Sequence, residues 1–173
     1  MIIMPNKELP QRKQLRLPEY NYSSAGKYFL TVCIKNRQNI LSDIVGGGAL
    51  DAPKIVLSPI GKIVEKYILS TNNIKNVSVL KYVIMPDHIH LLIGIQRPFG
   101  TSRAPSPTNE IIPHSISTLK RFVNRDIGEN IFQRSFYDHV VRGDVDYREI
   151  WEYIDANPIM WLNGKHDDSN YLR

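Results

Sequence analysis

A chain of 173 residues is long enough for one domain with a real hydrophobic core but too short for two large ones. Its composition, 42% hydrophobic and 23% charged, is that of an ordinary folded protein and excludes a low-complexity or disulfide-dense chain. The single cysteine, Cys33, cannot form an internal disulfide, and no apolar stretch approaches the roughly 18 residues needed to cross a bilayer. We therefore expect a cytoplasmic protein, neither secreted nor inserted in a membrane.

The net charge of +5 is concentrated near the N-terminus. Residues 1–40 hold seven basic and two acidic side chains, whereas the rest of the chain holds fifteen of each. Such a basic segment fits a polyanionic partner, but a charged tail that only aids solubility is the commoner case. We predict a basic N-terminal arm over residues 1–20, a folded domain over 21–163 and a polar tail over 164–173.

The first predicted strand covers residues 27–34, where aromatic and β-branched residues alternate. Residues 46–53, rich in glycine, interrupt this pattern. A helix then begins at Ser58 and Pro59, because a hydroxyl can cap a helix and a proline at its first position needs no backbone donor. Apolar residues at helical spacing continue this helix to near Thr71.

Two further strands, 77–85 and 88–95, are joined by a tight turn at Met85-Pro86-Asp87 and are therefore expected to be antiparallel. A proline-rich surface loop over residues 96–108 precedes a second helix that extends to about residue 126. These elements are followed by a fourth strand over 132–141.

The last helix is predicted to start at Asp144, as its cap, and to end near Asn157, because Pro158 disfavours helical geometry in the residue before it. The full order is strand, helix, strand, strand, helix, strand, helix. This order predicts a single α+β domain of the ferredoxin-like kind, in which helices cover an antiparallel sheet.

His88 and His90 are candidates for metal binding. Residues two apart on a strand point to the same face, so the two imidazoles converge while Ile89 faces the other way. Two histidines that only make hydrogen bonds on a sheet are an alternative, and from these three residues alone the more frequent one.

The last helix carries a second candidate pair. Four residues at spacings of three and four define its expected buried stripe: Tyr147, Ile150, Trp151 and Ile154. Tyr153 falls outside this stripe, and Asn157 lies one turn further on the same flank. A tyrosine with a solvated hydroxyl and a C-terminal cap would explain the pair equally well. If Asn157 ends the helix, the helix dipole favours a cation there, and two imidazoles with one amide oxygen suit Mg²⁺ or Mn²⁺.

Three segments in order carry a resemblance to a known family. They are Val83-Ile84-Met85-Pro86 followed by His88-Ile89-His90, then Tyr137-Asp138-His139-Val140-Val141-Arg142, then Tyr153-Ile154-Asp155-Ala156-Asn157-Pro158. From about Lys27 to Trp161 the chain resembles the REP-associated tyrosine transposases of the IS200-like Y1 group, in the HUH superfamily. The resemblance implies an HUH-type domain that recognises imperfect DNA hairpins and cleaves beside them.

The resemblance also assigns roles to individual residues. It implies that His88, His90 and Asn157 ligate a divalent metal, Mg²⁺ or Mn²⁺, and that Tyr153 is the nucleophile. The expected reaction is metal-dependent cleavage of single-stranded DNA through a 5′-phosphotyrosine, followed by rejoining without ATP. The chain would act as a monomer or homodimer. Five basic residues are candidates for DNA contacts: Arg37, Lys120, Arg121, Arg125 and Arg142.

Three other functions are alternatives to the transposase interpretation. A DNA hairpin-binding protein that kept the fold but lost the reaction would use the basic segment equally well, although the intact site residues argue against it. Barrel metallohydrolases with a His-x-His pair need about 250 residues, more than this chain has. A replication initiator of the same superfamily is closer, but the ending Tyr-Ile-x-x-Asn-Pro favours the transposase group.

Overall fold

Four strands form the central sheet. They are β1 (Gly26–Cys33), β4 (Val77–Ile84), β5 (His88–Ile95) and β6 (Tyr137–Val140). The strands lie in the order β4-β5-β1-β6, and each neighbouring pair is antiparallel. The computed structural model describes residues 22, 24–46, 52–96 and 111–164. The predicted N-terminal arm, nearly all of the predicted loop after β5 and nearly all of the predicted polar tail lie outside these residues.

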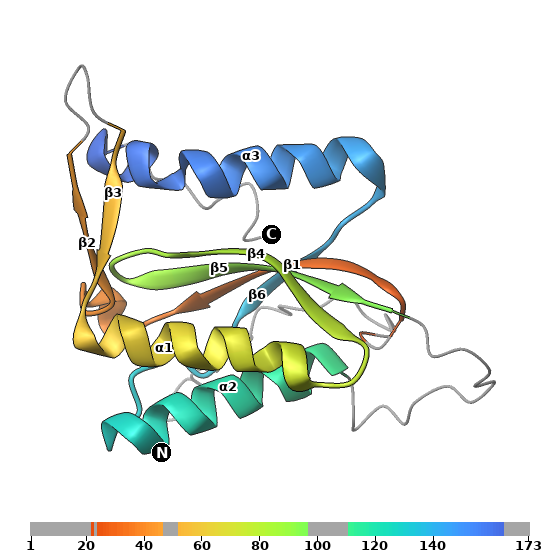
Figure 1. Cartoon of the computed structure of the whole chain (residues 1–173), viewed down its shortest axis with the longest axis horizontal. Coiled ribbons are helices and arrows are strands. Elements are labelled where there is room, and N and C mark those ends of the chain that lie inside the picture. Colours follow the sequence, from red (N-terminus) through yellow and green to blue (C-terminus); the bar gives the residue numbers. More distant parts are fainter. Residues whose placement is uncertain (1–21, 23, 47–51, 97–110, 165–173) are drawn as a thin grey trace, which may run out of the picture.

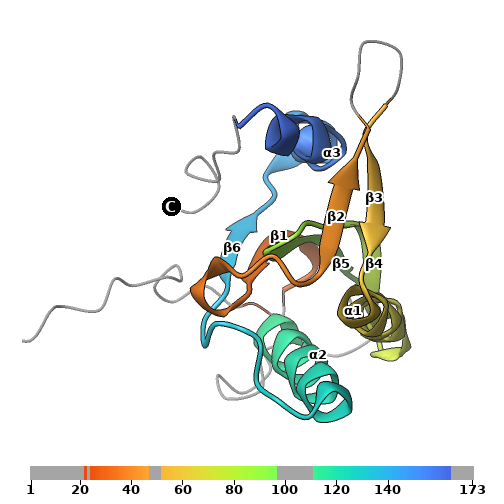
Figure 2. The same cartoon turned by 90° about the vertical axis from the view of Figure 1, so that its left-hand side faces the viewer.

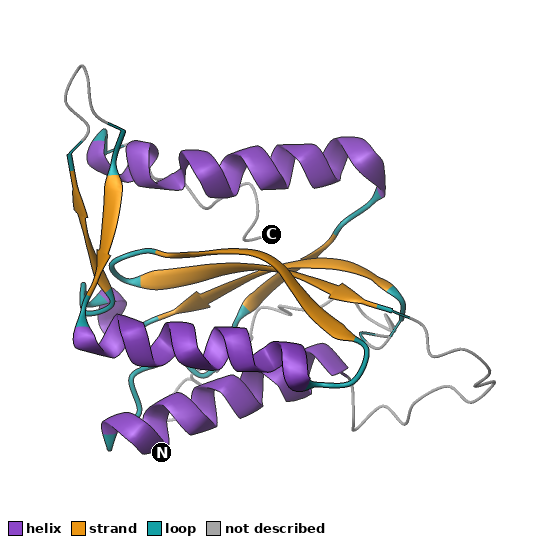
Figure 3. Cartoon of the chain, viewed as in Figure 1, coloured by secondary structure: helices purple, strands orange, loops and turns teal. Residues whose placement is uncertain are grey.

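Three α-helices cover the two faces of this sheet: α1 (Pro59–Ser70), α2 (Ile111–Ile127) and α3 (Gly143–Leu162). Figure 1 shows α1 and α2 side by side on one face and α3 on the opposite face, and Figure 3 shows the same layers coloured by element type. The order strand, helix, strand, strand, helix, strand is that of the ferredoxin-like fold, so the predicted fold class is confirmed. None of the helices in the described ranges is long and apolar enough to cross a membrane.

The alternation along the strands divides the interior into two cores. On β5, Ile89 and Leu91 pack with the residues of α1 and α2, whereas Leu92 packs with Ile150 and Ile154 of α3. Even-numbered residues of β5 therefore face α3. His88 and His90 are even-numbered, so their side chains lie on the α3 face of the sheet.

The predicted start of α1 is confirmed by its cap. The Ser58 hydroxyl oxygen accepts a hydrogen bond from the Gly61 amide at 3.0 Å, and Pro59 is the first helical residue. The same hydroxyl donates to the Ile40 carbonyl at 2.6 Å. One serine thus begins the helix and ties it to the segment that follows β1.

A short hairpin was missing from the predicted elements. It consists of β2 (Ser42–Val45) and β3 (Lys54–Leu57), and Figure 2 shows it standing beside α3 at one end of the sheet. Four-residue strands carry too little alternation to be recognised in a sequence. The fourth sheet strand is also shorter than predicted, because only Tyr137–Val140 pair with β1 and Phe132 makes an isolated bridge to Ile34.

Helix α3 departs from the prediction at both ends. Asp144 lies inside the first turn rather than at the cap, which Arg142 occupies without a side-chain hydrogen bond. At the other end the helix continues through Pro158 to Leu162, although proline lacks the N–H that would bond the Ile154 carbonyl. Pro158 is itself buried, so its packing in the interior outweighs the lost hydrogen bond.

The buried face of α3 is also rotated from the predicted stripe. Ile150, Ile154 and Asn157 are at most 2% exposed, whereas Trp151 is 36% exposed. The Trp151 ring instead lies on the surface beneath the Lys81 ammonium group, 3.9 Å from its centre. The true stripe passes closer to Tyr153 than the apolar pattern indicated, and Tyr153 is half-buried.

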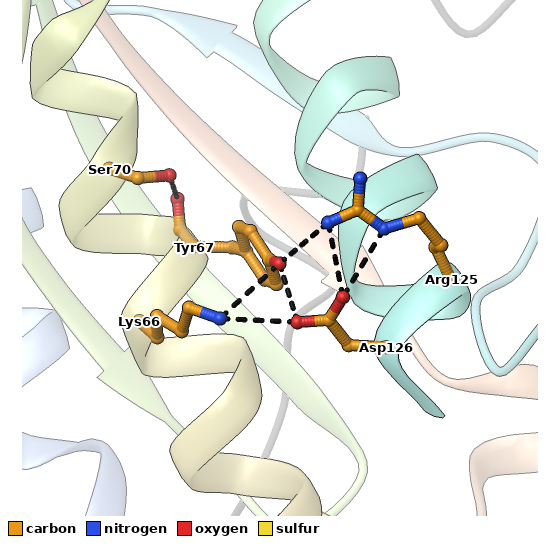
Figure 4. A network of polar contacts seen from close by, with 5 residues as sticks. All are labelled: Lys66, Tyr67, Ser70, Arg125 and Asp126. Carbon is orange, nitrogen blue, oxygen red and sulfur yellow. Dashed lines mark hydrogen bonds and ion pairs between the residues drawn. The ribbon is translucent and has the colours of Figure 1, made fainter. Parts of the chain in front are cut away.

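A polar network joins α1 to α2 on the face away from α3 (Figure 4). The Tyr67 hydroxyl donates to the Asp126 carboxylate, and Lys66 and Arg125 pair with the same carboxylate at 3.2 and 3.1 Å. The hydrogen bond from Tyr67, followed by that from Lys66, lowers the pKa of Asp126 from 3.8 to about 2.

Asp126→Asn is expected to lower the melting temperature at neutral pH but not at strongly acidic pH. A carboxylate with a lowered pKa in the folded protein stabilises it above pH 3.8, and this contribution is lost as the pH falls towards 2. Thermal melts of the wild type and Asp126→Asn should therefore differ at pH 7 and converge between pH 4 and pH 2. An equal difference at every pH would show that the ionised carboxylate is not what stabilises the pair of helices.

Candidate active site

His88 and His90 are fully buried and face each other beneath α3. Their Nε2 atoms are 3.1 Å apart and both residues are 0% exposed. The rings are held by their other nitrogens: Nδ1 of His88 is 2.5 Å from an oxygen of Asp87, and Nδ1 of His90 is 2.9 Å from the Thr31 hydroxyl. Because each Nδ1 is engaged, each Nε2 is directed into the space between the rings.

The partner of His90 follows from strand pairing. Thr31 lies directly opposite His90 in the β1–β5 register, so both side chains point to the α3 face. Phe29, two residues earlier on β1, stacks on the His90 ring with centroids 5.1 Å apart. The His90 ring is thus fixed in its plane by an aromatic contact and in its rotation by a hydrogen bond.

Helix α3 brings three residues of one face over the histidines. The Tyr153 ring packs against the His90 ring at 5.3 Å between centroids, and the Trp161 ring lies 6.2 Å from the His88 ring. Asn157 is midway between them, four residues from each, and therefore lies on the same helical face. The structure brings together four of the predicted site residues: His88, His90, Tyr153 and Asn157.

Asn157 is buried without a hydrogen-bond partner. It is 0% exposed, and neither its side-chain oxygen nor its side-chain nitrogen makes a hydrogen bond. A buried unsatisfied amide costs about 1–3 kcal/mol and therefore calls for an explanation. The prediction that Asn157 ends the helix is wrong, because α3 continues five residues beyond it. Asn157 is therefore not a C-terminal cap. The helix dipole does not explain its position either, since the dipole acts only within the last turn.

Among the described residues, no group of three or more His, Cys, Asp or Glu side chains could hold a metal ion. The two imidazoles would therefore need a ligand of another type. An amide oxygen is such a ligand for Mg²⁺ and Mn²⁺. The donor set of His88, His90 and Asn157 fits a divalent ion, and the orphaned amide of Asn157 is the observation on which this fit depends.

The segment Tyr137 to Arg142 anchors the start of α3. The His139 ring nitrogen Nε2 lies 2.9 and 3.0 Å from the two oxygens of Asp146, and one of these oxygens accepts the Arg142 amide at 2.6 Å. His139 and Asp138 had no assigned role in the sequence. The pairing of His139 with Asp146 fixes the helix that carries Tyr153 to the edge strand of the sheet.

Four of the five residues predicted to contact DNA do not lie at this site. Lys120, Arg121 and Arg125 lie on α2, on the opposite face of the sheet, and Arg142 is exposed at the start of α3. Lys120 donates to three backbone carbonyls, those of Gln133, Arg134 and Ser135, which gives it a structural role. As DNA contacts, these four residues remain predictions.

Sequence reasoning missed two residues that support the site, Asp87 and Thr31. Asp87 was assigned only to the turn before β5, although its position next to His88 was a usable signal. Thr31 is 59 residues away from His90 and becomes its partner only through strand pairing. Arg37, predicted to contact DNA, pairs with Asp87 at 3.3 Å.

Comparisons with known proteins identify relatives of this chain. A Haemophilus influenzae protein described as uncharacterized is 29% identical over 90% of this chain and 93% of its own length. The REP-associated tyrosine transposase of Escherichia coli K12 is 25% identical over 80% of this chain and 69% of its own. A solved structure of a REP-associated tyrosine transposase bound to a REP hairpin has a TM-score of 0.57 at 19% identity, covering 82% of this chain and 70% of that one.

The family model described as "Transposase IS200 like" matches residues 22–157. This range includes β1 with Thr31, both histidines, Tyr153 and Asn157, and it covers well over half of the 173 residues. The resemblance drawn from the three sequence segments is thereby confirmed. The chain belongs to the IS200-like transposase family.

Proposed function

We propose that this protein is a metal-dependent endonuclease and transposase that cleaves single-stranded DNA beside a hairpin, through a covalent link to Tyr153, and rejoins strands. One observation carries the proposal: two buried imidazoles lie beneath the helical face that carries both Tyr153 and the unsatisfied amide of Asn157. Membership of the transposase family supports DNA as the substrate. The hairpin bound in the similar solved structure supports a folded-back strand as the form recognised.

His88, His90 and Asn157 would hold a divalent metal. The Nε2 atoms of the two histidines, which lie 3.1 Å apart, and the side-chain oxygen of Asn157 would be the donor atoms. When bound, the ion supplies Lewis-acid polarisation of the scissile phosphate. The protein supplies a dry, fixed set of donors, because His88, His90 and Asn157 are all 0% exposed.

Tyr153 would perform the covalent step. Its phenol oxygen attacks the phosphorus and forms the 5′-phosphotyrosine, while the bond from phosphorus to the 3′ oxygen breaks. The phenol loses its proton and the leaving 3′ oxygen gains one. In the reverse reaction a 3′-hydroxyl attacks the same phosphorus and releases Tyr153, so no ATP is required.

Phe29 and His90 would fix the Tyr153 ring for this step. The Tyr153 ring packs edge-on against Phe29 at 5.9 Å and lies against His90 at 5.3 Å. A ring held between two partners loses little further freedom in reaching the reactive geometry. Arg142 is exposed at the start of the same helix. Of the residues predicted to contact the DNA backbone, it is the nearest to Tyr153 in the sequence.

The proposal is tested by incubating the protein with labelled single-stranded hairpin DNA, with and without Mn²⁺. We expect a covalent protein–DNA adduct that survives denaturing electrophoresis and depends on the metal. Peptide mapping should locate the label on the peptide that contains Tyr153. Hairpin binding with no adduct under any condition would contradict the catalytic proposal and would instead indicate a DNA-binding protein that has kept the fold.

Asn157→Leu should stabilise the metal-free protein and weaken metal binding. Leucine has the same number and branching of side-chain heavy atoms as asparagine and removes an unsatisfied amide, whose burial costs about 1–3 kcal/mol. Urea unfolding without metal and calorimetric titration with Mn²⁺ would measure the two effects separately. An unchanged Mn²⁺ affinity together with lower stability would show that the Asn157 amide serves the fold and not the ion.

A further inference from the structure

A strained turn follows β1 and carries Arg37. This turn, the 3-10 helix η1 (Lys35–Arg37), holds Asn36 at φ 54° and Arg37 at φ 52°. Asparagine tolerates this left-handed region, but arginine adopts it rarely, and such a conformation costs on the order of 1–3 kcal/mol. The rest of the structure must therefore hold Arg37 in place.

The strained conformation places the Arg37 side chain on Asp87. One guanidinium nitrogen lies 3.3 Å from the Asp87 oxygen Oδ2, and the other carboxylate oxygen, Oδ1, lies 2.5 Å from Nδ1 of His88. The Arg37 side chain is 38% exposed, the Asp87 side chain 9% and that of His88 0%. These three residues form a chain from the surface to the buried imidazole, which we call the Arg37–Asp87–His88 chain.

The backbone on either side of this chain is fixed as well. The Ile34 amide donates to the Asp87 carbonyl at 2.9 Å, and the Leu41 amide donates to the Pro86 carbonyl at 3.0 Å. The Met85 amide donates to the His88 carbonyl at 2.9 Å and closes the turn between β4 and β5. Asp87 therefore has little freedom to follow His88 if the ring turns, so the carboxylate sets the ring orientation.

We propose that Arg37 and Asp87 are positioning residues that preset His88 for metal binding, so that the metal affinity of the protein depends on Arg37 although Arg37 does not touch the ion. Because the Asp87 carboxylate accepts a hydrogen bond from Nδ1–H of His88, Nε2 is left as the ligating atom, and Arg37 holds Asp87 in that orientation. This inference rests on the proposed metal site. It assigns to Arg37 a role other than the DNA contact predicted from its charge.

Direct electrostatics and positioning predict opposite effects for Arg37. Removing a positive charge near a cation site would by itself strengthen cation binding. If Arg37 acts by holding Asp87, its removal should weaken binding, because the orientation of His88 is then no longer fixed. The sign of the change in Mn²⁺ affinity therefore separates the two effects.

The experiment is calorimetric titration of the full-length protein with Mn²⁺ in the absence of DNA. Asp87→Asn is expected to weaken Mn²⁺ binding about 10- to 100-fold, as is usual for partners of metal-bound histidines, and Arg37→Gln to weaken it by a smaller factor. The double variant should bind no more weakly than Asp87→Asn alone, because Arg37 acts through Asp87. Lys66→Gln, which breaks a Lys–Asp pair on the opposite face of the sheet, is the matched control and should bind as the wild type.

Three results of the titrations would overturn the inference. If the wild type binds Mn²⁺ and Arg37→Gln binds it equally well or more tightly, Arg37 does not position His88, while the proposed metal site stands. Additive effects in the double variant would also contradict a chain acting through Asp87. If the wild type itself binds no Mn²⁺, the proposed metal site fails together with the inference. Should Asp87→Asn not fold, Arg37→Gln, whose side chain is partly exposed, decides the question alone.

Discussion

Replacing Tyr153 with phenylalanine is expected to eliminate the covalent protein–DNA adduct while the protein remains folded. Tyr153 is half-buried and packs by its ring against Phe29 and His90, and phenylalanine preserves both contacts. Loss of the hydroxyl should cost about 1 kcal/mol of stability or less. The covalent reaction, by contrast, loses its nucleophile. Adduct formation with hairpin DNA and Mn²⁺ should fall below detection, and the thermal melt should be nearly that of the wild type.

Tyr147→Phe is the matched control for this variant. Tyr147 lies on the same helix and also packs against the core beneath α3, but its ring contacts Trp151 and the Lys27 ammonium group rather than the histidines. It should retain adduct formation at the wild-type level. A DNA adduct mapped to Tyr147, Tyr137 or any residue other than Tyr153 would show that the assignment of the nucleophile is wrong.

His88→Ala and His90→Ala are each expected to reduce cleavage about a thousandfold or more while hairpin binding is largely retained. Loss of a Lewis acid removes several kcal/mol of transition-state stabilisation, and each 1.36 kcal/mol is a tenfold change in rate. Both rings lie beneath α3 in the protein interior, so the DNA hairpin should still bind to the protein surface. Single-turnover cleavage and hairpin affinity, measured on the same preparations, would separate chemistry from binding.

His114→Ala is the control for the histidine variants, because His114 is exposed on α2, on the opposite face of the sheet. It should cleave as the wild type does. Each active-site variant should also have lost Mn²⁺ binding in calorimetry, as the metal-site proposal requires. Cleavage at the wild-type rate by both His88→Ala and His90→Ala would remove the metal from the reaction, whatever their stability.

Local patterns in the sequence were sufficient for the sheet and for the direction of the histidines. Strand alternation has a period of two, so the separation of His88 from His90 by one residue decided that both rings share a face. The start of α1 was equally local, since Ser58 and Pro59 act on the first turn alone. These features do not depend on distant contacts, which is why they could be predicted.

The details of α3 could not be predicted, because packing against the sheet overrides local preference there. Pro158 predicted that the helix ends near Asn157, yet the helix continues to Leu162 with Pro158 buried inside it. The apolar pattern placed Trp151 inside, whereas the structure exposes Trp151 and buries the polar Asn157. A polar residue at the centre of a buried face is a departure from pattern that is expected at a functional site.

The sequence by itself determined which residue types form the candidate site and on which elements they lie, because motifs and periodicity are properties of neighbouring residues. Only the tertiary structure decided how the site is supported. Thr31 meets His90 across 59 residues and Arg37 meets Asp87 across 50, and no local pattern records such a contact. Pairing of β1 with β5 places Thr31 beside His90, and the turn that follows β1 places Arg37 beside Asp87. The orientation of both imidazoles is therefore a consequence of the folded sheet.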